Sequence, residues 1–129
     1  MVNDGNTIKF IRETLGCDCP DEVFEKIEYG NADHGEETRM GTITVGGRLL
    51  VYIWKVNDLA MVEAKLPAVL LHGKEHRDRL GLNRIRIVLA TDNVERIGPM
   101  AQRLFKAWNR KDEKVHLHVL RTEDVALLP

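Results

Sequence analysis

The chain has 129 residues, of which 43% are hydrophobic and 30% are charged, and its formal net charge is −1. This length and composition fit one globular domain and exclude a disordered chain. The longest apolar run, residues 49–54, is far shorter than the roughly 20 residues of a membrane span, and the polar N-terminus is unlike a signal peptide. We therefore expect a single α/β domain over residues 1–129, located in the cytoplasm and not bound to a membrane.

Charge is divided unevenly between the two halves of the chain. Residues 1–64 contain six Lys and Arg against twelve Asp and Glu, whereas residues 65–129 contain thirteen against eight. A basic half is a feature of nucleic-acid-binding proteins, but aromatic residues make up only 5% of this chain and no nucleic-acid motif occurs. We expect the halves to attract each other within one fold or across a homo-oligomer, and we expect no nucleic-acid partner.

Two short helices are predicted at the N-terminus. Apolar residues at positions 8, 11 and 15 share one stripe of the first helix, and Gly16 supplies its stop signal. Pro20 fits the first position of a second helix, where an N–H group is not needed, and Cys19 would then be the N-cap. A strand begins near Ile27 to Tyr29, and residues 31–37 form a polar loop.

The remaining two thirds of the chain predict the order β-β-α-β-α-β. Strands over residues 38–45 and 48–56 are joined by Gly46 and Gly47, which supply the positive φ angles of a tight hairpin. Asn57 and Asp58 cap a helix that Pro67 interrupts, so a kink or two short helices are expected. Residues 72–83 are charged and predict irregular or weakly helical structure. A helix over 99–108 separates strands over 85–91 and 115–120.

Helical crossovers make the strands over 48–56, 85–91 and 115–120 parallel. The predicted fold is therefore an α/β fold with a mixed, mostly parallel sheet and helices packed on it. The strand over 48–56 is apolar on both faces, which places it inside the sheet. The following side chains are predicted to be largely buried: Ile8, Ile11, Leu15, Leu50, Tyr52, Trp54, Ile87, Leu89, Leu104 and Trp108.

Cys17 and Cys19 are the residues most suited to special chemistry. A Cys-x-Cys pair can bind a soft metal such as Zn²⁺ or Cu⁺, or it can exchange between dithiol and disulfide. A helix N-terminus stabilises a thiolate and makes Cys19 the more reactive thiol, whereas the acidic neighbours Asp18, Asp21 and Glu22 oppose the negative charge on both sulfurs. The alternative is that Cys17 is a small buried apolar residue and Cys19 a helix cap.

Residues 12–20, with the sequence Arg-Glu-Thr-Leu-Gly-Cys-Asp-Cys-Pro, and the following Glu22-Val23-Phe24 resemble the opening of a set of small prokaryotic proteins. These proteins share the pattern Glu-Thr-Leu-Gly-Cys-x-Cys-Pro and have no assigned activity. The resemblance covers about a tenth of the chain. It implies no catalytic residue, but it makes the two cysteines the first residues to test.

The histidines give a weaker metal pattern. His72 and His76 have the spacing of one helical face, but Gly73 between them predicts a helix end. His116 and His118 alternate along a strand and point to one side, which is more typical of a polar strand face than of a metal site. His34 lies in the polar loop, and its position relative to the cysteines is open.

A second predicted site lies at the edge of the sheet where the parallel strands end. Open α/β sheets bind ligands at this edge. The same residue types also cap the helices that follow the strands, which is the alternative. No glycine-rich phosphate loop is present, so a nucleotide site is not expected. The residues concerned are Asp58, Thr91, Asp92, Asn93, Glu123 and Asp124, with their neighbours Asn57 and Thr122.

Three functions remain open from the sequence. The first is a thiol-dependent role, either metal binding or redox exchange, at Cys17 and Cys19. The second is a non-enzymatic, self-associating interaction module. The third is a small-molecule enzyme at the strand edge.

Overall fold

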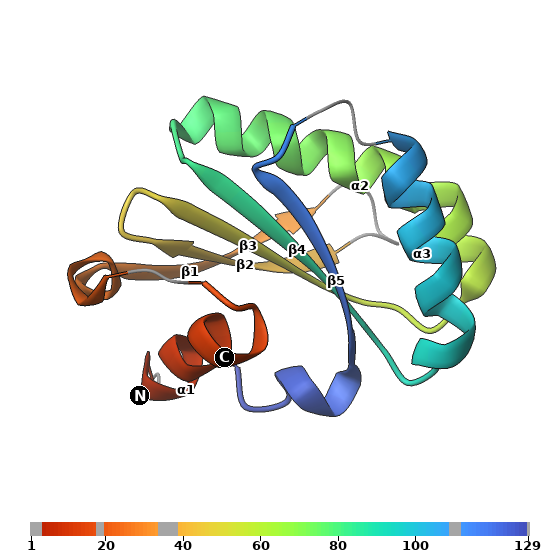
Figure 1. Cartoon of the computed structure of the whole chain (residues 1–129), viewed down its shortest axis with the longest axis horizontal. Helices are drawn as coiled ribbons and strands as arrows, with labels where there is room; N and C mark the ends of the chain where they lie inside the picture. Colours follow the sequence, from red (N-terminus) through yellow and green to blue (C-terminus); the bar gives the residue numbers. More distant parts are fainter. Residues whose placement is uncertain (1–3, 18–19, 34–38, 109–111, 129) are drawn as a thin grey trace.

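The computed structural model describes residues 4–17, 20–33, 39–108 and 112–128. Its centre is a five-stranded sheet with the strands in chain order (Figure 1). The first two pairings are antiparallel and the last two are parallel. The predicted mixed α/β fold is therefore confirmed. The strands are β1 (Ile27–Asp33), β2 (Arg39–Val45), β3 (Leu49–Lys55), β4 (Arg84–Thr91) and β5 (Val115–Arg121).

The predicted hairpin between β2 and β3 is confirmed. Gly46 and Gly47 have φ angles of +56° and +69°, and both belong to the left-handed region that a two-glycine turn requires. Six of the seven residues of β3 are buried, because β2 and β4 flank the strand and both faces of the sheet are covered.

Helices cover both faces of the sheet (Figure 1). α2 (Leu59–Leu80) and α3 (Val94–Trp108) lie together on one face. They share that face because both right-handed crossovers, from β3 to β4 and from β4 to β5, advance in the same direction along the sheet. The other face is covered by the N-terminal segment of α1 (Asp4–Lys9), the π-helix η1 (Phe10–Thr14) and the 3₁₀-helix η2 (Asp21–Glu25), and by η3 (Thr122–Val125) near the C-terminus.

Each face has its own apolar core. The core under α2 and α3 contains Leu50, Tyr52 and Trp54 of β3 among its buried residues. The core under the N-terminal segment contains Ile11 and Leu15. Most of the predicted core is confirmed, but Ile8, Leu104 and Trp108 are only partly buried because they lie at the edges of these two cores.

The alternative that Pro67 divides this region into two short helices is wrong. The helix runs without a break through Pro67 and Gly73, and it includes residues 72–80 of the segment for which irregular or weakly helical structure was predicted. The reason at Gly73 is packing: a Cβ atom there would lie 2.7 Å from Ile85 Cδ1. Glycine lets the helix approach the sheet closely, and this contact outweighs its poor helix propensity.

Two predictions near the N-terminus are also wrong. β1 continues to Asp33, so residues 31–33 pair with β2 and do not belong to a loop. Pro20 is itself the N-cap of η2, with an extended ψ of 156°, and the helix begins at Asp21. The geometric premise that made Cys19 a helix cap is thereby lost. Cys19, Asp18 and His34 lie outside the described residues.

Candidate functional site

Cys17 directly follows the end of the N-terminal helical segment. Gly16 has a φ of +73°, which ends the segment, and the Cys17 N–H group donates to the Ile11 carbonyl over 3.0 Å. Cys17 is half-buried against the core of this sheet face, and its sulfur takes part in a disulfide. Cys17 therefore belongs to the layer that covers this face of the sheet.

Arg12 connects the two short helices, η1 and η2, that flank the cysteines. Its guanidinium forms an ion pair with Asp21 and lies 4.8 Å from the centre of the Phe24 ring. Arg12 belongs to η1, whereas Asp21 and Phe24 belong to η2. The contacts therefore close the short stretch of chain that contains both cysteines.

A cavity of about 330 Å³ lies beside Cys17 at the edge where β3 and β4 begin. Its walls come from three parts of the chain: the N-terminal segment, the β2–β3 turn and the start of β4. Three of its side chains are arginines, and no acidic residue is among the described residues that line it. The lining residues are Gly16, Cys17, Pro20, Arg48, Leu49, Asn83, Arg84 and Arg86.

Arg86 is the most enclosed of the three arginines, with 8% of its surface exposed. Its Nη1 atom donates to the Leu15 carbonyl over 2.9 Å and to His118 Nε2 over 3.0 Å. Its Nε atom is buried without an acceptor among the described residues. Arg86 therefore ties the end of the N-terminal helical segment to the sheet, but it has no carboxylate partner in the described part of the chain.

Two histidines of β5 lie beside the arginines of β4. Arg84 Nη1 is 3.2 Å from His116 Nε2, and an arginine can only donate, so both imidazoles accept through Nε2. Burial, followed by the charges of Arg86 and His116, lowers the pKa of His118 to about 4. Burial, followed by the charges of the same two arginines, lowers the pKa of His116. Both histidines are thus neutral at pH 7, and they hold the guanidinium groups without neutralising them.

Sequence reasoning missed this basic cluster. Arg84 and Arg86 alternate with two isoleucines at the start of a buried strand, so both must point to one face of the sheet. His116 is the register partner of Arg86 on β5, and His118 lies two residues further along the same strand. Charged residues at alternate positions of an inner strand indicate such a cluster, but the neighbouring strand that supplies the histidines could not be identified from the sequence.

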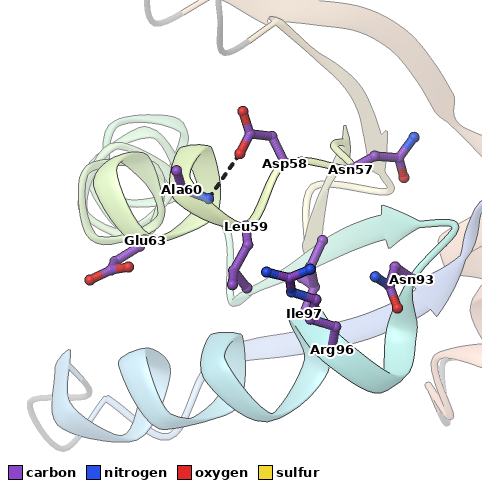
Figure 2. Close-up of a pocket in the computed structure, with 8 residues that line it drawn as sticks. All are labelled: Asn57, Asp58, Leu59, Ala60, Glu63, Asn93, Arg96 and Ile97. Carbon is purple, nitrogen blue, oxygen red and sulfur yellow. Dashed lines mark hydrogen bonds between the residues drawn. The ribbon is translucent and has the colours of Figure 1, made fainter.

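The predicted strand edge also encloses a cavity, of about 740 Å³ (Figure 2). Asp58 at the start of α2 lies across this cavity from Asn93 and Arg96 at the start of α3. Asp58 caps α2: its Oδ1 atom accepts from Ala60 N over 2.9 Å, as Figure 2 shows. The carboxylate is therefore already engaged by the helix.

The other predicted edge residues are engaged in the same way. Asn57 Oδ1 accepts from the Thr91 hydroxyl and from Asp92 N, and the Thr91 hydroxyl accepts from Asn93 N. Asp124 accepts from Arg121 N at the start of η3, and neither Asp124 nor Glu123 is among the described residues that line the cavity. Asp58 and Asn93 therefore line the cavity together. Thr91 and Asp92 bond to Asn57, which also lines it, whereas Glu123 and Asp124 do not line it.

His72 and His76 do lie on one continuous helix, but His76 is engaged by the sheet. Its Nδ1 atom is 2.6 Å from the Tyr52 hydroxyl. Burial raises the pKa of Tyr52 to about 12, and burial lowers the pKa of His76. A neutral phenol and a neutral imidazole therefore share this hydrogen bond, and the pair connects α2 to β3. Among the described residues there is no group of three or more His, Cys, Asp and Glu side chains that could hold a metal ion.

Comparison of the chain with protein-family models, curated proteins and solved structures gives no match. Within the described ranges, no helix is both long and apolar enough to cross a membrane. The cavity beside Cys17 and the cavity at the strand edge are the features of the fold that bear on function. The cavity beside Cys17 is distinguished by Arg86, whose Nε atom is buried and has no hydrogen-bond partner among the described residues.

Proposed function

We propose that this chain is a thiol–disulfide exchange protein whose Cys17–Cys19 segment alternates between a disulfide and two thiols. The observation that supports the proposal is the position of Cys17, which is disulfide-bonded and lines a cavity with Arg48, Arg84 and Arg86. Nearby positive charge stabilises a thiolate, which is both the nucleophile and the leaving group of thiol–disulfide exchange.

The exchange runs in two steps. A substrate thiolate attacks one sulfur of the protein disulfide, a mixed disulfide forms, and the other protein sulfur leaves as a thiolate and takes up a proton. A second substrate thiolate attacks the substrate sulfur of the mixed disulfide and releases the second protein thiol. Two substrate thiols, having lost two protons, become one disulfide, and the protein gains two electrons and two protons. The reverse sequence reduces a substrate disulfide.

The same charges argue against the metal-binding alternative. Zn²⁺ and Cu⁺ are cations, and three guanidinium groups around one ligand would repel them. The proposal places the protein in the cytoplasm, where a disulfide is transient and is used for catalysis or redox sensing. At the strand edge Asp58 caps α2 and Asn57 bridges to Asp92, so no specific observation favours an enzyme site there.

The test is a redox titration of the full chain in mixtures of reduced and oxidised dithiothreitol, with the thiols counted by alkylation and mass. We expect one reversible two-electron transition in the wild type and none in Cys17→Ser or Cys19→Ser. A peptide of residues 12–24 is the matched control, because it contains both cysteines without the arginines of the cavity. The folded protein should be reduced about ten times faster than the peptide by the same thiol.

Two results would contradict the proposal. One is a folded protein that is reduced no faster than the peptide. The other is a purified protein that contains one zinc ion per chain and whose thiols react only after chelation, which would support the metal-binding function.

A further inference from the structure

Three arginines of the cavity beside Cys17 have no acidic partner among the described residues. By contrast, Arg12, Arg77 and Arg121 each form an ion pair with a carboxylate. Arg48 and Arg84 are exposed at the rim, whereas Arg86 is more than nine-tenths buried. Positive charge is thus concentrated at one hollow of the surface, and no described carboxylate neutralises it there.

The hydrogen bonds of Arg86 leave two of its nitrogen atoms without acceptors among the described residues. Nη1 makes both of its side-chain bonds, to Leu15 and His118. Nε is fully enclosed and unbonded, and Nη2 makes no bond within the described residues and is not fully enclosed. Arg86 lines the cavity, and Nη2 is its one nitrogen that is both accessible and without an acceptor among the described residues. A guanidinium that has lost its water and gained no counter-ion costs free energy unless an anion approaches it.

The size of the cavity limits the ligand. A volume of about 330 Å³ is near the lower end for small-molecule pockets. Guanidinium groups bind carboxylate, sulfonate and phosphate groups by paired, charge-assisted hydrogen bonds. A molecule that fits this cavity would be small and would carry one such group, and Cys17 forms part of the same wall.

We infer that Arg48, Arg84 and Arg86 form a binding site for an oxyanion group, and that this group is carried by the thiol that exchanges with the Cys17 disulfide. The second half of this inference rests on the proposed exchange function, whereas the first half does not. In the bound state the anionic group lies against the arginines, and the thiol of the same molecule reaches the disulfide.

The first experiment tests the anion site with inorganic sulfate as the probe and the oxidised full chain as the protein. Thermal unfolding is measured in sulfate and in chloride at equal ionic strength. Sulfate stabilises most proteins by exclusion from their surfaces, so the informative quantity is the excess over a control. Arg103→Met is the matched control, because Arg103 is exposed on α3 and lines a different cavity.

We expect a saturable excess stabilisation by sulfate in the wild type and in Arg103→Met, and its loss in Arg84→Met and Arg48→Met. Both rim arginines are exposed, so their replacement should leave the fold intact even if Arg86→Met does not fold. Equal stabilisation of all four proteins would overturn the anion site.

The second experiment identifies the source of the anion. The disulfide is reduced with 2-mercaptoethanesulfonate, 2-mercaptoethanol and cysteamine, which share a two-carbon chain and carry a negative, no or a positive charge. Each rate constant is divided by the fraction of the reagent that is present as thiolate, so that differences in thiol pKa do not affect the comparison. We expect the sulfonate to react about ten times faster than the neutral thiol, as a charge-assisted bond would give, and cysteamine to be slowest. This preference should disappear in Arg84→Met and persist in Arg103→Met.

The outcomes separate the two proposals. Sulfate binding without a preference among the thiols would overturn the thiol as carrier and leave a site for a free anion. Sulfate binding in a protein that none of the three thiols reduces faster than the peptide would overturn the exchange function and keep the anion site. Fast reduction by all three thiols with no sulfate binding would overturn the anion site and keep the exchange function.

Discussion

Two arginines of this protein are buried to nearly the same extent, yet they have opposite surroundings. Arg77 near the end of α2 is 7% exposed and Arg86 in β4 is 8% exposed. Arg77 donates to Asp112 through Nη1 and Nη2, over 3.2 and 2.8 Å, and to Asp78 through Nε and Nη2. Within the described residues, the side chain of Arg86 donates only from Nη1, to a carbonyl and to a neutral imidazole.

The pKa values of the two guanidinium groups move in opposite directions. The hydrogen bond with Asp112 raises the pKa of Arg77, and burial followed by the charge of Arg84 lowers the pKa of Arg86. Arg77 joins α2 to the chain just before β5 and uses all of its nitrogens within the fold. Arg86 keeps two nitrogens without acceptors among the described residues, beside a cavity. Equal burial thus accompanies a structural role in one region and a binding role in the other.

The largest loss in the free energy of unfolding is expected from Arg77→Met. The substitution removes four hydrogen bonds and leaves the carboxylate of Asp112, which is 19% exposed, without its cation. A fully enclosed pair would cost about 3–5 kcal/mol to break, and the remaining water access reduces this to about 2 kcal/mol. Urea unfolding at pH 7 measures the loss. Arg79→Met, at an exposed position two residues away, is the control, and an equal midpoint for both variants would contradict the structural role of Arg77.

Neither arginine could be interpreted from the sequence alone. Arg77 lies in residues 72–83, whose charged sequence predicts irregular or weakly helical structure, and Gly73 adds a helix-stop signal. The structure shows that Gly73 lies against Ile85 and that the helix continues. Tertiary packing decided this element, and a single sequence does not contain that information.

The strands were predicted more successfully because their signals are local. Gly46 and Gly47 determine the hairpin, and helix-length connections determine the parallel pairings. β1 was recognised only near Ile27, because its last residues include Asn31 and Asp33, which favour turns when no partner strand is known. Local patterns therefore predicted the fold class, whereas the lengths and ends of the strands depended on the strands they pair with.

The candidate site could be predicted only in part. The sequence indicates Cys17 because a Cys-x-Cys pair can bind a soft metal or form a disulfide, but the arginines of the cavity are distant from it in sequence. The strand-edge residues were correctly placed near a cavity, but the structure uses Asp58 and Asn57 in capping and bridging bonds. Which polar groups a fold leaves unsatisfied is a property of the three-dimensional contacts, and no sequence pattern reports it.

A smaller loss of stability is expected at low pH. It depends on His118, which accepts a hydrogen bond from Arg86. Its pKa is about 4 in the folded protein, against the ordinary histidine value of 6.5 expected for the unfolded chain. The unfolded chain therefore binds this proton more readily, so the contribution of neutral His118 is complete above pH 6.5 and is lost as the pH falls to about 4. The effect will be smaller than that of Arg77→Met because His118 is only partly buried and water screens its charge.

His118→Gln tests this pH dependence, because glutamine can accept from Arg86 but does not titrate. The free energy of unfolding should fall less steeply between about pH 6.5 and about pH 4.5 in the variant than in the wild type. His76, whose pKa is also lowered, remains in both proteins and cancels in the difference, whereas the difference includes the coupling between His116 and His118. Parallel curves would show that the proton on His118 is not coupled to folding.

The smallest effect is expected from Arg86→Met in chloride buffer, with a change in the free energy of unfolding below about 1 kcal/mol. The variant loses the hydrogen bonds to the Leu15 carbonyl and to His118. It also loses a buried cation that has no carboxylate partner in the described chain, and removing such a charge while keeping the volume is often neutral or stabilising. These two changes oppose each other, unlike those at Arg77, where both the bonds and the charge pairing are lost. Urea unfolding in chloride compares the two variants directly. A loss of about 2 kcal/mol or more for Arg86→Met would show that its hydrogen bonds outweigh its unpaired charge, and both arginines would then have the same structural role.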